Sequence, residues 1–184
     1  MAAVLNLPVV FTVQNNQFAY SSPNDTEFGT PNVADRAAGY GIPAKIIDGN
    51  DIYEVIDAIH DSCENARNGN GPSLIELVTF RHYGHAGHDP AEYVNDEVRE
   101  FWMKRDPIAR FEDALIQENL FTTEQFVSLS EDLEAEIKET LDWAKNQDDP
   151  DPKNEELDMF AERKMPKIEN SKNNKETMNF IEAI

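Results

Sequence analysis

The sequence predicts an α/β protein, in which a parallel sheet with crossover helices is followed by a helical C-terminal region. Within the first 80 residues, three short apolar segments alternate with two segments of helical character. Strands joined in this way pair in parallel, because a connection that contains a helix cannot be a hairpin. From residue 96 onward, apolar residues recur at three- and four-residue steps, which is the period of a helix.

Three strands are expected in the first half of the chain. Residues 9–13 (Val-Val-Phe-Thr-Val) are apolar and mostly β-branched, and we expect a strand that is buried on both faces. Residues 44–48 and 73–80 have the same character, and each follows a segment that contains glycine and proline.

Two helices are expected to connect these strands. Residues 32–40 fit a short helix with Asn32 as its N-cap, and Gly41 is expected to end it. Asp51 can cap a second helix, whose apolar side chains recur at helical spacing up to Gly69. These helices are the crossovers that a parallel sheet requires.

Three further helices are expected after the sheet. The first covers residues 96–105, and the pair Asp106 and Pro107 has the residue types of an N-cap and a first helical position that open the second. Thr122 and Gln125 form a capping-box pattern before a long third helix. Their apolar faces indicate packing or subunit contacts rather than catalysis.

Composition and charge exclude several classes of function. The 184 residues include 36 acidic and 16 basic side chains, which gives a formal net charge of -20. Such a surface repels phosphate backbones and anionic lipid, so we expect no nucleic-acid partner and no membrane partner. Cys63 is the only cysteine, which excludes an intrachain disulfide and a cysteine-based zinc site. A reducing compartment fits this composition, and we expect a cytoplasmic protein.

Polar residues follow two of the predicted strands, at the strand ends where parallel sheets bind ligands. Asn15 and Asn16 follow the first strand, and residues 81–89 follow the third. Amide oxygens are suitable ligands for Mg²⁺, although asparagine also ends strands routinely. The segment 81–89, expected at the same edge, favours a functional interpretation of the asparagine pair.

Residues 81–89 hold three of the four histidines, between an arginine and an aspartate. One interpretation is a loop for proton transfer and for holding an anionic group, since histidine titrates near neutral pH. Another is a metal site formed by His82, His85, His88 and Asp89. A third is a polar surface loop without chemistry, and spacing alone leaves all three open.

Five motifs follow one another within residues 1–90. They are Leu-Pro-Val-Val-Phe-Thr-Val-Gln-Asn-Asn-Gln-Phe-Ala at 7–19, Ala-Asp-Arg-Ala-Ala-Gly-Tyr-Gly-Ile-Pro at 34–43, Asp-Gly-Asn-Asp at 48–51, Gly-Pro-Ser-Leu-Ile-Glu at 71–76, and Phe-Arg-His-Tyr-Gly-His at 80–85 with Asp-Pro at 89–90. Together they resemble the α part of the E1 component of 2-oxo acid dehydrogenase complexes. The resemblance covers about residues 1–147 and implies a thiamine-diphosphate-binding fold that is incomplete in this chain.

The resemblance also implies site residues, position by position. Asn16 matches the asparagine whose side chain ligates Mg²⁺, and Phe18 matches the residue whose backbone carbonyl ligates the same ion. His85 matches the catalytic histidine, which handles protons and acyl transfer beside the cofactor, and Arg81 matches the arginine of the same loop. The implied cofactors are thiamine diphosphate and Mg²⁺, with Asn16, Phe18, Arg81 and His85 in contact with them.

The sequence departs from the family pattern in two respects. The family's thiamine motif opens with Gly-Asp-Gly, whose aspartate ligates Mg²⁺, and none of the 14 residues before Asn15 supplies it. Ala86 stands where mammalian relatives have a phosphorylated serine, so that switch cannot operate here. In the family the β part also contributes the pyrimidine end of the cofactor site, so we expect the chain alone to be inactive.

The resemblance divides the chain into four expected parts. Residues 1–90 match the carboxyl-terminal half of a thiamine-diphosphate-binding domain, and residues 91–147 match the helical region of E1 α. Residues 148–176 form an acidic linker, and residues 177–184 resemble the start of an E1 β part. We therefore expect a piece of an αβ-fused E1, in which Met1 is an internal residue.

The function that the resemblance implies is oxidative decarboxylation of pyruvate or a branched-chain 2-oxo acid, with acyl transfer to the lipoyl group of an E2 component. The implied partners are an E1 β part, fused or separate, and a lipoyl-bearing E2, in an oligomeric assembly. An acetoin dehydrogenase-type E1 is an alternative within the family. A non-catalytic remnant that binds metal through its histidine loop is an alternative of another class.

Overall fold

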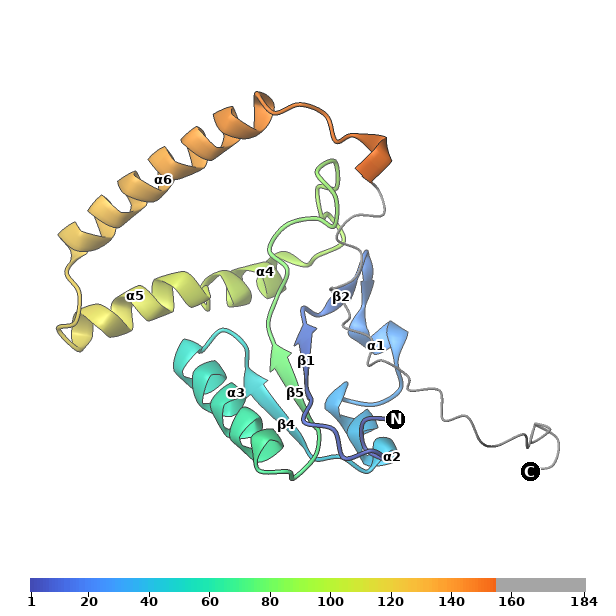
Figure 1. The fold of residues 1–184 in the computed structure, drawn as a ribbon. Helices are drawn as coiled ribbons and strands as arrows, with labels where there is room; N and C mark the ends of the chain where they lie inside the picture. Colours follow the sequence, from blue (N-terminus) through green and yellow to red (C-terminus); the bar gives the residue numbers. More distant parts are fainter. Residues whose placement is uncertain (155–184) are drawn as a thin grey trace. The chain divides into compact units, whose positions relative to one another are not determined.

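The computed structural model describes residues 1–154 (Figure 1). Met1–Leu133 forms one compact unit, and a second unit begins at Glu134. Most of the predicted linker and all of the predicted β-like start, residues 177–184, lie outside the described residues. The predicted division into four parts therefore stays a prediction.

A three-stranded parallel sheet forms the centre of the first unit (Figure 1). Its strands are β1 (Val10–Asn15), β4 (Ala44–Asp48) and β5 (Ser73–Val78), in the spatial order β1-β5-β4. β5, the last of the three in sequence, pairs in parallel with both of the others. The predicted α/β fold class with a parallel sheet is confirmed.

One face of the sheet is covered by α3 (Ile52–Arg67), the longer of the two predicted crossover helices. The side chain of Asp51 accepts the N–H of Glu54 at 3.1 Å, which confirms the predicted cap. The side chains that join this helix to the sheet are Val10, Ile47, Val55, Ala58, Ile59, Ile75 and Leu77. Burial of this apolar set is the main force that holds the crossover in place.

The opposite face is covered by two short elements instead of the single helix predicted over residues 32–40. A 3₁₀ turn, η1 (Ala34–Arg36), leads into α2 (Ala37–Tyr40). Asn32 is not the N-cap, because its own N–H donates to the Asp35 carboxyl at 3.0 Å and its side chain makes no capping bond. Gly41 ends α2 as predicted, with φ at 70°, a left-handed conformation that glycine adopts without strain.

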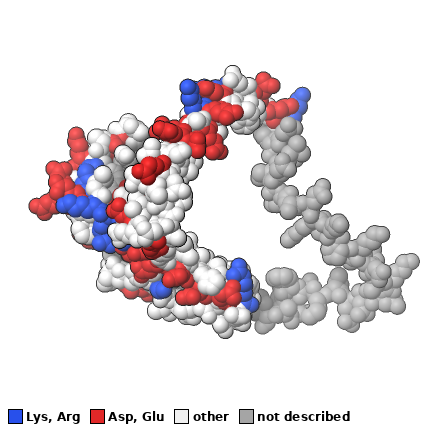
Figure 2. Space-filling model, turned by 90° about the vertical axis from the view of Figure 1, so that its left-hand side faces the viewer, with Lys and Arg blue, Asp and Glu red and all other residues white. Residues whose placement is uncertain are grey.

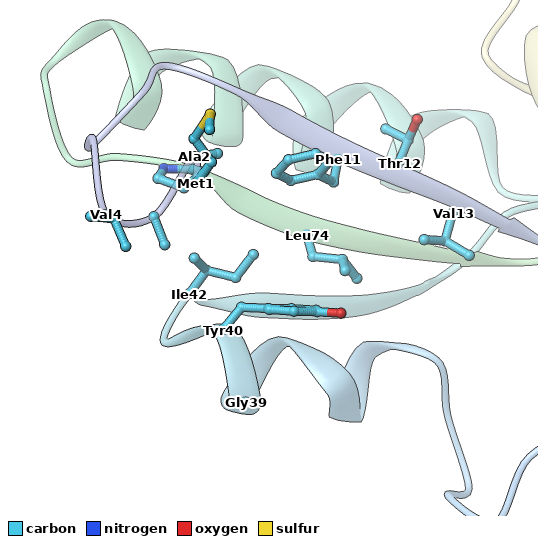
Figure 3. A pocket seen from close by; sticks show the side chains of 12 residues that line it. Met1, Ala2, Val4, Phe11, Thr12, Val13, Gly39, Tyr40, Ile42 and Leu74 are labelled. Carbon is cyan, nitrogen blue, oxygen red and sulfur yellow. The ribbon is translucent and has the colours of Figure 1, made fainter. Parts of the chain in front are cut away.

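The prediction that the first strand is buried on both faces is wrong. β1 is an edge strand of the described sheet, and the Phe11 side chain is 42% exposed. Figure 3 shows why: Phe11 and Leu74 face an apolar hollow of about 620 Å³ that Met1, Val4 and Tyr40 only partly enclose. Helical cover on this side is limited to the short α2, which leaves the amino-terminal half of the face open.

Three short elements follow β1, and a helical region follows β5. The first group comprises β2 (Phe18–Ala19), β3 (Ser22–Pro23) and α1 (Asn24–Glu27), none of which the sequence predicted. The second comprises α4 (Asp96–Met103), α5 (Pro107–Gln117), α6 (Thr123–Lys145) and η2 (Pro152–Asn154). The three α-helices of the second group confirm the predicted helical region.

The predicted helix starts in this region are formed by the expected side chains. The Asp106 carboxyl accepts the N–H of Ile108 at 2.8 Å, with Pro107 at the first turn of α5. Thr122 and Gln125 exchange two bonds, from the Thr122 N–H to Gln125 at 2.9 Å and from the Gln125 N–H to Thr122 at 3.3 Å. This reciprocal pair is the capping box that the sequence indicated.

An ionic cluster ties α5 and the segment before it to the carboxyl end of β4. The Asp48 carboxyl accepts bonds from Arg105 at 2.6 Å and Arg110 at 3.0 Å. Beside it, the buried Asn50 side chain donates to the Arg105 carbonyl at 2.8 Å and accepts the Thr79 hydroxyl at 2.6 Å. These bonds hold the start of α5 and the segment before it against the sheet.

Acidic side chains outnumber basic ones over the face of the molecule seen in Figure 2, in keeping with the composition. In the described part of the chain, no helix is long and apolar enough to cross a membrane.

The Asp48 cluster predicts a pH-dependent part of the stability. Burial alone would raise the pKa of Asp48, but the Asn50 N–H and the guanidinium groups of Arg110 and Arg105 outweigh it, so the pKa lies below its ordinary value of 3.8. Because the folded pKa is depressed, this stabilisation is fully present above the unfolded value of 3.8 and is lost progressively as the pH falls below it, toward and through the lower pKa of the folded state.

We therefore expect Asp48→Asn to lower the free energy of unfolding by about 1 kcal/mol near pH 7. The difference from the unmodified chain should shrink when urea unfolding is repeated below pH ~4. The control is Asp57→Asn on the exposed side of α3, with an expected change of less than about 0.5 kcal/mol near pH 7. A difference for Asp48→Asn that stays constant down to pH ~3 would contradict the assignment.

Candidate functional site

The predicted site residues lie at the carboxyl ends of β1 and β5. Hydrogen bonding between the two chain segments continues past the strands, from the Thr79 N–H to the Asn15 carbonyl at 2.9 Å and from the Arg81 N–H to the Asn16 carbonyl at 3.3 Å. Two segments are thereby held side by side: the β1 turn, residues 15–24, and the histidine loop, residues 81–91. The prediction that these polar segments share one edge of the sheet is confirmed.

Asn15 is the centre of the β1 turn. Its amide group donates to the Glu76 carboxyl at 2.6 Å and accepts bonds from the Asn24 side chain at 2.6 Å and the Gln17 N–H at 3.2 Å. The amide oxygen of Asn15 also accepts a bond from the Gln17 side chain at 3.2 Å. With its oxygen shared among three donors, Asn15 is a structural residue rather than a ligand.

Asn16 and Phe18, the two predicted metal ligands, lie in the same turn. The Asn16 amide oxygen accepts the Phe18 N–H at 3.2 Å and has a second lone pair for another partner. The Phe18 ring packs against Phe80 at 6.0 Å and Tyr93 at 5.6 Å between centroids, which holds this backbone segment in place. An amide oxygen and a main-chain carbonyl are hard, neutral donors of the kind that Mg²⁺ accepts, so the donor set fits that ion.

Left-handed backbone conformations are concentrated at this site. Gln17, Tyr20 and Ala91 have φ angles of 73°, 56° and 54°, and all three belong to the β1 turn or the histidine loop. Such a conformation costs a residue other than glycine roughly 1–2 kcal/mol, and it persists only where surrounding contacts fix it. At Gln17 those contacts are the bonds of its N–H and side chain to Asn15.

Arg81 connects the two segments through its side chain. Nη2 donates to the Tyr20 carbonyl at 2.5 Å and to the Tyr93 hydroxyl at 2.7 Å, and Nε donates to the Tyr83 carbonyl at 3.1 Å. Nη1 has no partner among the described residues. Arg81 therefore holds the histidine loop against the β1 turn, and its Nη1 can still donate to an anionic group.

Asp89 closes the histidine loop from its far end. Its carboxyl accepts the N–H of His85 at 2.7 Å, the N–H of Ala91 at 2.9 Å and the hydroxyl of Tyr93 at 2.8 Å. The Ala91 N–H, followed by the His85 N–H, holds the pKa of Asp89 below its ordinary value. The pKa of Tyr93 is raised, first by burial and then by its bond to Asp89, so Tyr93 stays a protonated donor.

His85, the predicted catalytic residue, is exposed at the tip of this arrangement. Its ring lies against Tyr20 of the β1 turn, with 4.9 Å between centroids, and it lines a hollow of about 450 Å³ formed by the histidine loop. His82 instead packs its ring against Phe80 at 5.6 Å. The structure brings Arg81 and His85 against the turn that carries Asn16 and Phe18, as the sequence predicted.

The alternative of a metal site within the histidine loop finds no support in the described residues. His82, His85, His88 and Asp89 do not come together, and no group of three or more histidine, cysteine, aspartate or glutamate side chains in residues 1–154 could hold a metal ion. The Asp89 carboxyl is directed at N–H and O–H donors of its own loop instead.

Sequence reasoning missed four residues of this site. They are Tyr20, Asn24, Glu76 and Tyr93. One of them carried a usable signal: Glu76 is the only charged residue in β5 and lies between apolar neighbours, and a buried carboxyl needs specific partners. Tyr20 meets Arg81 across 61 positions, and no motif in the sequence marks the bonds of Asn24 to Asn15 or of Tyr93 to Asp89.

Comparisons with known proteins agree on one family. Residues 1–153 match the family model described as "Dehydrogenase E1 component". The chain is 39% identical over 160 residues to the alpha subunit of acetoin:2,6-dichlorophenolindophenol oxidoreductase from Bacillus subtilis (strain 168), covering 85% of this chain and 46% of that protein. From the same organism, it is 35% identical over 161 residues to the alpha subunit of the pyruvate dehydrogenase E1 component (86% and 42% covered) and 36% identical over 146 residues to the alpha subunit of 2-oxoisovalerate dehydrogenase (79% and 44%). The chain thus spans about half the length of the curated relatives it matches.

The geometry of the histidine loop predicts different effects at its two glycines. A β-carbon at Gly84 would overlap the Asp89 carbonyl and lie 2.6 Å from the Asp89 side chain, whereas nothing lies within 4 Å of one at Gly87. We expect Gly84→Ala to break the bond from the His85 N–H to Asp89 and to speed hydrogen exchange of that N–H at least about fivefold. Gly87→Ala is the matched control and should leave this exchange unchanged. Equal exchange in the two variants would show that Gly84 does not shape the loop.

Proposed function

The chain belongs to the dehydrogenase E1 component family, and on that premise we propose that it is part of a thiamine-diphosphate-dependent 2-oxo acid dehydrogenase. The proposed reaction is the oxidative decarboxylation of pyruvate or a branched-chain 2-oxo acid, with acyl transfer to the lipoyl group of an E2 component. The observation that carries the proposal is the meeting of Asn16 and Phe18 with Arg81 and His85 at one edge of the sheet.

In this proposal the β1 turn holds the metal. Asn16 would offer its amide oxygen and Phe18 its main-chain carbonyl to Mg²⁺, and both are held by the bonds and ring contacts around them. Bound thiamine diphosphate would supply the electron sink for decarboxylation. Two protein oxygens leave most of the magnesium shell to other ligands, in agreement with the Gly-Asp-Gly half-site that the family has and these residues lack.

His85 and Arg81 have separate tasks in the proposal. His85 is exposed, and histidine is the side chain that enzymes use most often to transfer protons, so it suits that task at the mouth of the site. The cationic Arg81 is held between Tyr20 and Tyr93 and favours anionic groups beside the histidine loop. Asp89 keeps the His85 backbone in place through its bond to the His85 N–H.

We propose an E1 β part, fused or separate, and a lipoyl-bearing E2 as partners in an oligomeric assembly. The helical region supports this proposal, since α6 exposes a row of apolar side chains at helical spacing. They are Leu129, Leu133, Ile137 and Leu141. A cytoplasmic location stays a prediction, which cell fractionation tests.

Acetoin is a second candidate substrate. The acetoin oxidoreductase subunit has the highest identity of the three relatives compared, 39% against 35% and 36%. Steady-state assays of the complete E1 protein with pyruvate, a branched-chain 2-oxo acid and acetoin distinguish the candidates by kcat/KM.

We predict that the 184-residue chain alone binds Mg²⁺ and thiamine diphosphate weakly or not at all, because the residues present supply only part of the metal shell. Isothermal titration calorimetry at millimolar Mg²⁺ measures this. The complete E1 protein is the positive control. Micromolar binding by the isolated chain would overturn the prediction of a half-site.

We also predict that His85→Asn in the complete E1 protein lowers kcat by about 10²–10⁴, the range for loss of a group that transfers protons. His88→Asn is the matched control, since this exposed histidine lies three residues away in the same loop and should leave kcat within about twofold. A normal kcat for His85→Asn would remove His85 from the proposed mechanism.

A further inference from the structure

A fully buried glutamate lies beneath the candidate metal site. The Glu76 side chain is 0% exposed and belongs to β5, the central strand of the sheet. One carboxyl oxygen accepts the Asn15 side-chain N–H at 2.6 Å, and the other accepts the Ala34 main-chain N–H at 2.6 Å. No lysine, arginine or histidine forms an ion pair with it in the described part of the chain.

Burial of the Glu76 carboxyl lowers the stability of the fold unless other interactions offset it. The neighbours of Glu76 along β5 are Leu74, Ile75 and Leu77, and a buried carboxyl costs free energy that its hydrogen bonds must offset. An apolar residue would suit the strand better. The cost indicates that the carboxyl has a function, and among the described residues Asn15 is the one side chain that bonds to it.

The contact with Glu76 determines how the Asn15 amide is turned. An amide has its oxygen and nitrogen on opposite sides, so fixing the nitrogen on Glu76 directs the oxygen toward Gln17 and Asn24. Those two residues in turn hold the β1 turn, because the Asn24 N–H also bonds to the Gln17 carbonyl at 3.2 Å. If the Asn15 amide were reversed, its oxygen would face the Glu76 carboxyl and its nitrogen would face N–H donors. The bonds of this amide to Glu76, Gln17 and Asn24 would then all be lost.

We propose that Glu76 is a positioning residue for the metal site: through Asn15 it fixes the β1 turn in the conformation that presents the Asn16 amide oxygen and the Phe18 carbonyl. The functional meaning of this inference rests on the proposed function, since Asn16 and Phe18 are the ligands proposed there. Glu76 itself touches neither metal nor substrate. Loss of such supporting contacts lowers metal affinity by about 10–100-fold in other metal sites.

The test exchanges the chemical groups of the two partners. Glu76→Gln leaves one N–H donor facing another, and Asn15→Asp places two carboxyls against each other. In the double variant a glutamine amide donates to an aspartate carboxyl, its oxygen accepts the Ala34 N–H, and the second aspartate oxygen accepts from Gln17 and Asn24. The bond is restored with donor and acceptor exchanged.

Hydrogen exchange of the Gln17 and Ala34 N–H groups in the 184-residue chain is the readout, followed by NMR. We expect each single variant to speed exchange of the Gln17 N–H at least about tenfold relative to amides of β4. The double variant should return to within about threefold of the unmodified chain. If a single variant fails to fold, recovery of a cooperative thermal transition in the double variant replaces this comparison.

Ile75→Val is the matched control. Ile75 is the neighbour of Glu76 in β5, is equally buried and faces α3 instead of the β1 turn. The Ile75→Val variant should speed hydrogen exchange throughout the sheet. It should not change the ratio between the exchange rate of the Gln17 N–H and the rates of the β4 amides. A double variant that exchanges as fast as the worse single variant would overturn the proposal, and so would a Glu76→Gln chain with unchanged Gln17 exchange.

The complete E1 protein separates this proposal from the proposed function. There, Glu76→Gln should weaken apparent Mg²⁺ affinity about tenfold, with kcat restored at saturating Mg²⁺, and the double variant should recover the affinity. Asn16→Ala should weaken it at least as much. If Asn16→Ala leaves Mg²⁺ affinity unchanged while the exchange results hold, the proposed metal role is wrong and the positioning of the turn by Glu76 stands.

Discussion

The parallel pairing of β5 with both of its neighbours is the constraint on which the rest of the structure depends. Val78 at the end of β5 is in register with Asn15 on one side and Asp48 on the other, so all three strands end at the same level. The β1 turn, the histidine loop and the Asp48 cluster therefore start from one edge. None of them can move away from the others unless the central strand separates from its neighbours.

The site at this edge is rigid because residues anchored in or near the sheet hold two left-handed residues of the β1 turn by hydrogen bonds. Gln17 and Tyr20 are in left-handed conformations that their own sequence does not favour. The Asn15 amide oxygen accepts the Gln17 N–H, and the Arg81 guanidinium donates to the Tyr20 carbonyl. Asn15 is the last residue of β1, and Arg81 lies three residues after the end of β5. Because both are fixed by the sheet, the β1 turn that they hold is rigid as well.

The local parts of this architecture could be predicted from the sequence. The β-branched segments, the Asp51 and Asp106 caps and the capping box all depend on residues within a few positions of one another, and the structure has each of them. The order of strands and helices placed the asparagine pair and the histidine loop at one edge of a parallel sheet, and the resemblance to a family singled out Asn16 and His85 within them. These signals are local or depend on motif order, and both are visible in a single chain.

What the sequence could not predict depends on contacts across the sheet. The central place of β5, the β2 and β3 pair, and the bond from Asn15 to Glu76, 61 positions apart, follow from tertiary packing alone. The misjudged burial of Phe11 has the same origin. An apolar strand is typical of a buried position, but whether both faces are covered depends on neighbours that its own sequence does not contain.

The open face and the candidate site lie at opposite ends of the strands, and this separation matters for the function. Phe11 and Leu74 line the open hollow near the amino-terminal ends, whereas Asn15 and Glu76 bond to each other farther along the same strands. The bonds described for the β1 turn and the histidine loop join residues within 15–93. The geometry of this half of the site therefore follows from bonds among these residues and does not depend on how the hollow at the amino-terminal ends of the strands is covered.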